Sequence, residues 1–400
     1  MNEATWNYVR QHADEDVRKL ALQGVKDADV DLQMALQQIA GRQTAGRKLP
    51  SWAAVDGIIY PPHLNMEQCS SEQTARYKAK IAGEGDSMVD LTGGFGVDFY
   101  WISQGFQHRQ YIEQNEELCA ISSHNFEVLG QDCTVNCCDA VTYLTTMPHV
   151  DLIYLDPARR NEHGGRTYGI ADCTPNVLEL QSLLMEKADR VMLKLSPMLD
   201  WRKAVEDLKY VTEVHIVSVD NECKELLIEV RKSEGEQVRI ICVNLLSNGE
   251  QQVFETSSNG GQPSPSHLLT FSPSHPPTFL YEPNASMMKA GCFTEVEERF
   301  PVRQIAPNSH LFLSDVEIED FPGRKFQILA ISSMNKQDIK KYFSEFLVSM
   351  KSANIAVRNF PLTVEQLQKK LKLKDGGDTY IFATTTTDGA HRLFICRKIG

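Results

Sequence analysis

The segment DLTGGFGVD, residues 90–98, decides how this chain folds. It overlaps the end of the apolar run MVDL at 88–91 and leads into a stretch with helical spacing, so it reads as a strand–turn–helix. Glycine in such a turn lets the backbone approach a ligand closely, and the start of the helix favours an anionic group. A plain tight turn is the alternative, because a glycine-rich turn alone is not specific.

The turn departs from the dinucleotide-binding fingerprint at one position. In that fingerprint the residue three after the last turn glycine is Gly or Ala, which lets the helix pack closely on the strand. Here Phe99 stands three residues after Gly96. The sequence therefore favours a carboxylate, such as that of methionine, over a pyrophosphate at this turn.

Around the turn, short apolar runs alternate with amphipathic helical stretches, which is typical of a parallel sheet covered by helices. Two further runs, at 214–220 and 224–230, are too close together for a parallel crossover and predict an antiparallel hairpin. We therefore expect an α/β, Rossmann-like sheet of five parallel-type strands plus a terminal antiparallel hairpin. The five runs are MVDL at 88–91, RQYIE at 109–113, CTVNC at 133–137, DLIYLD at 151–156 and RVMLKL at 190–195.

The sequence divides into four segments by composition and periodicity. Residues 1–60 read as an N-terminal helical lobe, and residues 61–235 contain the sheet. Residues 236–278 hold further strand runs and a linker rich in Ser, Pro and Gly. Residues 279–400 read as a separate mixed α/β domain.

The bulk composition limits the classes of protein that fit. No apolar run is long enough to cross a bilayer, and the N-terminus lacks the apolar stretch of a signal peptide. The ten cysteines form no CxxC pair and do not alternate with histidines, so we expect reduced thiols, no metal and a cytoplasmic protein. The net charge of −12 argues against coating nucleic acid by charge alone.

The C-terminal tail differs in charge from the rest. Residues 358–398 hold eight basic and four acidic residues, a local charge of +4. A basic surface for nucleic acid is one interpretation, and an ordinary solvated face is the other.

Acidic residues follow successive strands. Glu113 ends the second strand, where a carboxylate can accept from two ribose hydroxyls, and Asp139 follows the third, where it can accept from an adenine amino group. Taken alone, each of these residues is equally well explained as an ordinary acidic residue on the protein surface. Together with the glycine turn they converge on the crevice at the carboxyl ends of the strands, where such sheets bind ligands.

In this order, DLTGGFGVD, YIEQNEEL, NCCDA and LDPARR resemble the successive motifs of class I S-adenosylmethionine-dependent methyltransferases. The resemblance covers about 170 residues and implies S-adenosyl-L-methionine as the cofactor. Asp90, Gly94 and Gly96 would then surround its methionine part, with Thr92 in place of the usual first glycine. The resemblance further assigns Glu113 to the ribose and Asp139 with Ala140 to the adenine. Ser71 and Arg76, in CSSEQTARYKA, resemble the preceding segment that helps to close the pocket in nucleic-acid methyltransferases.

The segment DPARR, residues 156–160, ends the fourth strand, where a substrate would meet the methyl group. It resembles the D-P-P-aromatic motif of enzymes that methylate amino groups, in which Asp156 would orient an exocyclic amine and Pro157 would turn a backbone carbonyl toward it. Ala158 and Arg159 depart from the motif. We expect Asp156, Pro157 and Arg159 at the reaction site, with Arg160, His163 and Arg166 in a basic substrate loop that could contact phosphate. A turn with two exposed arginines is the alternative.

The segment LYEPNASMMKAG, residues 280–291, and the sequence beyond it resemble a THUMP-like C-terminal domain. True THUMP domains bind structured RNA, so the resemblance implies an RNA substrate. Together with the motif at Asp156, we expect methylation of an exocyclic amino group of a base in tRNA or rRNA, with no membrane and no DNA partner. Two alternatives stay open: a methyltransferase acting on a small molecule or a protein, and a non-catalytic RNA-binding protein that retains the fold.

Overall fold

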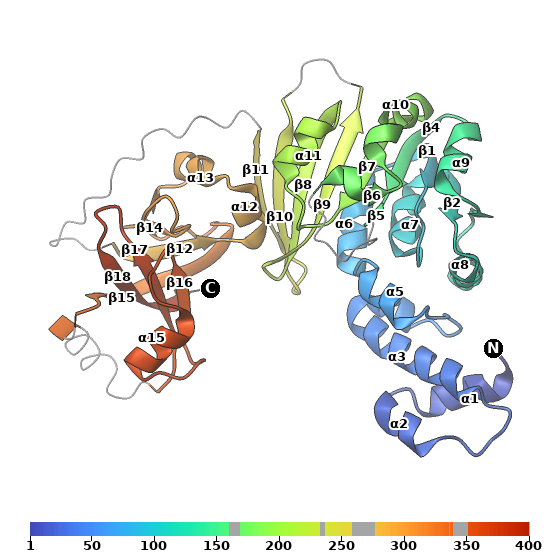
Figure 1. Cartoon of the computed structure of the whole chain (residues 1–400), viewed down its shortest axis with the longest axis horizontal. Coiled ribbons are helices and arrows are strands. Elements are labelled where there is room, and N and C mark those ends of the chain that lie inside the picture. The colour runs from blue at the N-terminus through green and yellow to red at the C-terminus, as the bar shows by residue number, and fades with distance from the viewer. Residues whose placement is uncertain (160–168, 233–236, 258–276, 336, 339–350, 400) are drawn as a thin grey trace. The chain divides into compact units, whose positions relative to one another are not determined.

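The computed structural model describes residues 1–159, 169–232, 237–257, 277–335, 337–338 and 351–399. The chain divides into two compact units, each with its own core. The first consists of Met1–Val214 and Glu225–Glu236, and the second of His215–Lys224 and Gln237–Gly400. Figure 1 traces the chain through both units in sequence order.

The first unit begins with helices, as the sequence predicts. Asn2, Asp16 and Asp31 each accept a hydrogen bond from a backbone N–H in the first turn of the helix that they precede, which satisfies an otherwise unpaired donor. Val9, Leu20, Ala35 and Ile39 form a small core between the first three helices. The helices are α1 (Glu3–Gln11), α2 (Val17–Gln23), α3 (Leu32–Lys48), α4 (Pro50–Ala53) and α5 (His63–Gln68).

The predicted sheet follows. Strands β1 (Gly85–Asp90), β2 (Phe106–Glu113), β3 (Thr134–Cys137), β4 (Val150–Leu155) and β7 (Ala188–Leu195) are paired in parallel. Strand β9 (Glu222–Arg231) pairs antiparallel with β7. Within the first unit the order is β8-β9-β7-β4-β1-β2-β3, where β8 (Val211–Val219) enters with its first residues. The expected parallel sheet with a terminal hairpin is confirmed.

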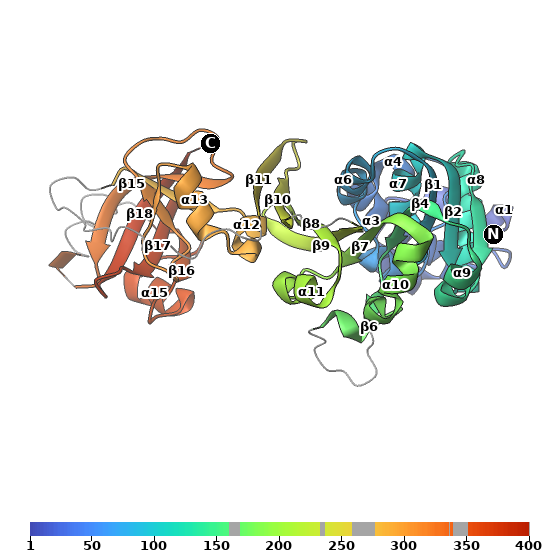
Figure 2. The same cartoon turned by 90° about the horizontal axis from the view of Figure 1, so that it is seen from above.

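Helices cover both faces of this sheet (Figure 2). Helices α6 (Glu72–Ala82), α7 (Val97–Ile102) and α8 (Glu116–Val128) lie on one face. Helices α9 (Ala140–Thr146), α10 (Val177–Lys187) and α11 (Trp201–Asp207) lie on the other. A buried core of Met88, Phe99, Tyr111, Phe126 and Leu152 holds β1, β2 and β4 against α7 and α8. This packing fixes the carboxyl ends of the strands relative to one another.

Short elements complete the first unit. The turn between β8 and β9, Asp220-Asn221, belongs to the second unit, and both residues have positive φ, 46° and 66°, as a two-residue hairpin requires. After β4 come β5 (Ala158–Arg159) and β6 (Cys173–Thr174), which pair antiparallel with each other. Two single-turn 3₁₀ helices, η1 (Ser103–Gly105) and η2 (Ile170–Asp172), lie after α7 and before β6.

The second unit contains two sets of strands. The second half of β8 lies next to β10 (Arg239–Leu245), which pairs antiparallel with β11 (Gln251–Ser257). A separate sheet has the order β13-β14-β12-β15-β18-β17-β16. Its core is made by Leu280, Phe326, Phe382 and Phe394, all buried. The expected linker at 257–277 lies almost entirely outside the described residues.

The separate sheet of the second unit consists of β12 (Phe279–Pro283), β13 (Arg303–Gln304), β14 (Phe312–Ser314), β15 (Gly323–Ser333), β16 (Asn354–Arg358), β17 (Thr379–Thr385) and β18 (His391–Ile399). In the described part of this unit the helices include α12 (Ala285–Ala290), α13 (Phe293–Arg299) and α15 (Val364–Leu371). Among the helices that the structure describes, none is both long enough and apolar enough to span a membrane.

Candidate active site

The glycine turn after β1 requires glycine for two different reasons. Gly94 and Gly96 have φ of +56° and +80°, a region that other residues adopt only with strain. A Cβ atom on Gly93 would lie 2.1 Å from the Tyr111 ring, and one on Gly96 would lie 2.6 Å from the Phe126 ring. The backbone of this turn therefore lies directly on the aromatic core of the unit, and its conformation is fixed.

Glu113, the last residue of β2, lies against this turn. Its Oε2 accepts a hydrogen bond from the Gly94 N–H at 2.8 Å, and its Oε1 accepts one from the Asn115 N–H at 2.8 Å. The side chain is half-buried. Two backbone donors thus orient the carboxylate that the sequence assigns to the ribose.

Asp139 and Ala140 lie at the carboxyl end of the next strand, β3. Asp139 precedes α9 and accepts from the N–H and the hydroxyl of Thr142, at 2.8 and 2.9 Å, through Oδ1. Cys137 stands opposite Glu113 in the parallel pair β2–β3, so Asp139 follows Glu113 around the same edge of the sheet. The structure places the residues assigned to ribose and adenine on neighbouring strands.

Asp90, Thr92 and Asp156 meet where β1 and β4 end side by side. The Asp156 N–H donates to the Thr92 Oγ at 2.6 Å, and the Thr92 N–H donates to the Asp90 Oδ1 at 2.9 Å. Asp90 is buried, and this burial raises its pKa well above the usual range, although the Thr92 N–H lowers it. The sequence-predicted reaction residue Asp156 therefore contacts the glycine turn directly.

Of the other two predicted reaction residues, Pro157 and Arg159, the structure describes Pro157 fully and only the backbone of Arg159. Pro157 is buried, and the backbone of Arg159 pairs with Cys173 in the β5–β6 ribbon. The side chain of Arg159 and the rest of the expected basic loop, which includes Arg160, His163 and Arg166, lie outside the described residues.

Ser71 and Arg76, which were expected to help close the cofactor pocket, make their contacts within α6 and with α7. Ser71 precedes α6 and accepts from the Thr74 N–H at 3.2 Å. Arg76 contacts Glu72 at 2.7 Å, and its guanidinium lies 3.9 Å from the centre of the Trp101 ring. These contacts connect Ser71 and Arg76 to α6 and α7, and among the described residues neither side chain contacts Glu113 or Gly94.

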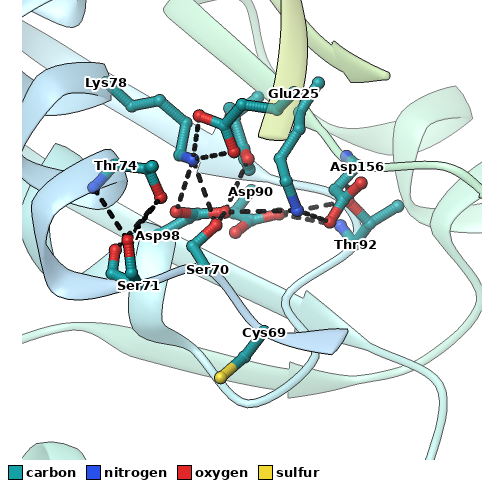
Figure 3. A network of polar contacts seen from close by, with 12 residues as sticks. Cys69, Ser70, Ser71, Thr74, Lys78, Asp90, Thr92, Asp98, Asp156 and Glu225 are labelled. Atoms are coloured by element: carbon teal, nitrogen blue, oxygen red, sulfur yellow. Dashed lines mark hydrogen bonds and ion pairs between the residues drawn. The ribbon is translucent and has the colours of Figure 1, made fainter. Parts of the chain in front are cut away.

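The structure adds a network of charged side chains that the sequence did not reveal (Figure 3). Lys78 of α6 is buried and points between two carboxylates. Its Nζ lies 3.1 Å from Asp98 Oδ1 and 2.7 Å from Glu225 Oε1, and it donates to Ser70 Oγ at 3.0 Å. Such a lysine is tolerated in a protein interior only because each of its protons has an acceptor.

A second lysine, Lys194, connects this network to Asp156. Its Nζ lies 2.5 Å from Asp156 Oδ2 and 3.9 Å from Asp98 Oδ2. Burial alone would lower the pKa of Lys194, but the carboxylates of Asp156, Asp98 and Glu225 outweigh it and raise the pKa. Three carboxylates thus face two ammonium groups at the strand ends.

Asp98 joins the two lysines. Burial by itself would raise its pKa, but Lys78 and Lys194, with hydrogen bonds from Tyr154 and Ser70, lower it. The Tyr154 hydroxyl donates to Asp98 Oδ2 at 2.8 Å, and burial raises the pKa of this tyrosine well above its usual range. At neutral pH the network therefore contains ionised Asp98 and a neutral phenol.

One signal in the sequence could have indicated this network. Lys194 interrupts the buried run RVMLKL, where a charged residue needs a partner. The local sequence does not predict the pair between Lys78 and Glu225, because the two residues are 147 positions apart. They come together in the folded chain, where β9 runs antiparallel to β7. Among the described residues, no group of three or more His, Cys, Asp or Glu side chains is placed to hold a metal ion.

Comparisons with known proteins match the second unit by family models and the whole chain by a solved structure. A ferredoxin-like domain model matches residues 279–322, and a model described as THUMP domain-like matches residues 323–398. The crystal structure of a proposed methyltransferase from Porphyromonas gingivalis W83 is 31% identical and covers 99% of this chain and 98% of its own, with a TM-score of 0.87. This chain belongs to the class I S-adenosylmethionine-dependent methyltransferases with a THUMP-like C-terminal domain. The resemblance seen in the sequence is confirmed.

Other solved structures match the methyltransferase over shorter stretches. M. capricolum TrmK in complex with S-adenosyl-homocysteine is 11% identical and covers 41% of this chain and 69% of its own, with a TM-score of 0.31. An rRNA methylase from Streptococcus thermophilus is 12% identical and covers 40% of this chain and 96% of its own, with the same TM-score. No curated protein matches the methyltransferase.

Proposed function

We propose that this methyltransferase transfers a methyl group from S-adenosylmethionine to a nucleotide in structured RNA, of the tRNA or rRNA class. The observation that carries the proposal is the meeting of the glycine turn, Glu113, Asp139 and Asp156 at the ends of four neighbouring strands. A ligand that needs a carboxylate site, a ribose acceptor and an adenine acceptor in this order fits S-adenosylmethionine.

Each cofactor contact follows from a group already oriented. The turn around Gly94 and Gly96 would receive the methionine part, and the fixed Glu113 carboxylate would accept from the ribose hydroxyls. Asp139 uses Oδ1 for its helix, so Oδ2 would accept from the adenine amino group beside Ala140. The methyl group would then face Asp156, which lies on the neighbouring strand end. Much of the rate enhancement of methyl transfer comes from such alignment.

The RNA part of the proposal is supported by the second unit. This unit matches a THUMP domain-like model. A methyltransferase that acts on small molecules rarely needs such an additional domain. Exposed Lys369, Lys370, Lys372 and Lys374 on and after α15 would contact phosphates. The DPARR motif alone predicts an exocyclic amine as the acceptor, but the ion pair between Lys194 and Asp156 changes the donors and acceptors at that position.

The test uses the full-length protein, S-adenosylmethionine with a labelled methyl group and total RNA from cells that lack the gene. We expect label in the RNA and micromolar binding of S-adenosylhomocysteine, about −8 kcal/mol, by calorimetry. Label in a protein or a small-molecule extract but not in RNA would overturn the substrate class. Tighter binding of NAD, or no heat with either S-adenosyl compound, would overturn the cofactor assignment.

A further inference from the structure

The carboxylate at the proposed reaction position already has one partner. Asp156 Oδ2 lies 2.5 Å from Lys194 Nζ, while the Asp156 N–H is used by Thr92. The side chain of Asp156 is 39% exposed and that of Lys194 is 13% exposed. Among the residues that the structure describes, no contact to Asp156 Oδ1 is present. Within the part of the chain that the structure describes, a substrate group arriving here therefore meets Oδ1 as an open acceptor and one ammonium group beside it.

The ammonium group of Lys194 keeps its proton. The carboxylates that act on it are Asp156 after β4, Asp98 on α7 and Glu225 on β9. Lys78 and Tyr154 contact the same Asp98, and the Cys69 thiol also interacts electrostatically with Lys194. The three carboxylates hold its pKa above the usual range despite burial. Lys194 is thus a hydrogen-bond donor at neutral pH, and a base only if that proton is removed.

This donor–acceptor pair discriminates between two kinds of nucleophile. An exocyclic amine must aim its lone pair at the methyl carbon, which leaves only N–H groups, and these cannot accept from Lys194. A hydroxyl group fits both partners at once. Its proton is donated to Asp156 Oδ1, one lone pair accepts from Lys194, and the other lone pair attacks the methyl carbon.

We propose that the methyl acceptor is a hydroxyl oxygen, which in RNA is the ribose 2′-hydroxyl, held between Lys194 and Asp156. This inference rests on the proposed function, of which it specifies the accepting atom. It replaces the exocyclic amine that the DPARR motif suggested. The oxygen lone pair forms the new C–O bond as the C–S bond breaks and its electron pair returns to sulfur. The hydroxyl proton passes to Asp156 and then to water.

The charge of the network suits this reaction. Two ammonium groups, Lys78 and Lys194, face the carboxylates of Asp98, Asp156 and Glu225, which leaves one net negative charge. The sulfonium of the cofactor would offset that charge in the reactant. As the methyl group transfers, positive charge moves from sulfur to the attacking oxygen and its proton becomes strongly acidic. A carboxylate is then a sufficient acceptor, and no stronger base is required.

The position of the label in RNA tests the inference. RNA methylated with labelled cofactor is hydrolysed with alkali, a reaction in which the 2′-oxygen attacks the adjacent phosphate. A 2′-O-methyl group blocks that attack, so we expect the label in alkali-stable dinucleotides. Label in mononucleotides, on a base, would overturn the inference and leave the proposed function intact. RNA without any label would overturn the proposed function together with it.

Variants of Lys194 test its role separately. Lys194→Met should lower kcat about a hundredfold, while the Kd for S-adenosylhomocysteine stays within about threefold of the wild-type value. Lys194→Arg should keep part of the wild-type rate, because arginine still donates a hydrogen bond. The exposed Lys209→Met is the matched control. The wild-type rate should stay level from about pH 7 to about pH 10, where Lys194 remains protonated. A rate that rises roughly tenfold per pH unit, or full activity of Lys194→Met, would overturn the assignment.

Discussion

Each unit of the molecule contains a buried carboxylate held by cations, and the two clusters differ in what they leave open. In the second unit Glu282 is 4% exposed. Its Oε2 accepts from the Arg324 Nε at 2.6 Å, and its Oε1 accepts from Arg358 at 2.9 Å. The two arginine side chains are 36% and 35% exposed. The carboxylate therefore lies inside, with both oxygens paired, and the cations lie outside.

The charged side chains at the strand ends of the first unit, here called the strand-end network, have the reverse arrangement. They are Lys78, Asp98, Asp156, Lys194 and Glu225. Its most buried member is a cation, Lys78, and its most exposed charged member is a carboxylate, Asp156. A cluster whose outer member keeps a free oxygen can bind a ligand, whereas a cluster with both oxygens paired mainly stabilises its fold. The difference shows that burial of charge alone does not identify a site. The feature that distinguishes the first unit is the partly exposed carboxylate of Asp156, whose Oδ1 has no partner among the described residues.

The largest expected effect is on stability. Lys78→Met removes the ammonium group that pairs with the buried Glu225 and with Asp98, so we expect it to lower the free energy of unfolding of the first unit by about 3–5 kcal/mol. Glu282→Gln should cost the second unit less, about 1–2 kcal/mol, because its arginines are partly solvated.

Tryptophan fluorescence can separate these two effects. All four tryptophans, at positions 6, 52, 101 and 201, belong to the first unit. Urea unfolding followed by fluorescence should thus shift for Lys78→Met and not for Glu282→Gln, whose effect appears in circular dichroism. Lys80→Met, an exposed lysine on the same helix, is the control. Equal shifts for Lys78→Met and Lys80→Met would contradict the network.

The next largest effect is on chemistry. Asp156→Ala removes the carboxylate that would accept the substrate proton, and we expect methyl transfer to RNA to fall by at least a hundredfold, about 2.7 kcal/mol in activation free energy. The Kd for S-adenosylhomocysteine should stay within a few-fold. Asp189→Ala, an exposed aspartate near the opposite end of β7, should leave both unchanged. Full activity of Asp156→Ala on a verified RNA would remove Asp156 from the reaction site.

A smaller effect is expected on cofactor affinity. Glu113→Ala removes the ribose acceptor, and Gly94→Leu forces a side chain into a backbone conformation with φ of +56°. Each should weaken S-adenosylhomocysteine about tenfold, or 1.4 kcal/mol, by calorimetry. Glu117→Ala, an exposed glutamate on α8, is the control. Unchanged affinity in both variants would place the cofactor elsewhere.

The smallest effect per residue concerns RNA binding by the second unit. Lys369, Lys370, Lys372 and Lys374 are exposed. Changing each of them to Gln should weaken RNA binding without altering cofactor affinity. Each lost phosphate contact should reduce the slope of log affinity against log salt by roughly 0.7 to 0.9. Lys19→Gln with Lys80→Gln in the first unit is the control. If the slope is unchanged, the basic loop between Arg159 and Arg166 becomes the better candidate.

The parts of the site that the sequence predicted share one property. Asp90, Glu113, Asp139 and Asp156 each end or directly follow an apolar run, so the local pattern places them at one edge of a parallel sheet. The fold was predictable for the same reason, since strand, turn and helix alternate within short distances. Lys78 and Glu225 depend on a pairing between distant segments, and Arg76 turned toward Trp101 by side-chain packing. The local periodicity of the sequence predicts neither the Lys78–Glu225 pair nor the contact of Arg76 with Trp101.

The ion pair between Lys78 and Glu225 also has a consequence for synthesis of the protein. Domains generally fold as units while the chain emerges from the ribosome. The glycine turn, Glu113 and Asp156 all precede β9, yet Lys78 lacks one of its two carboxylates until Glu225 has been made. In a nascent chain that ends after β7, the buried Lys78 would have Asp98 and Ser70 as partners but not Glu225. The strand-end network can therefore be completed only after the terminal hairpin has been added, so the last strands of the first unit determine when this network forms.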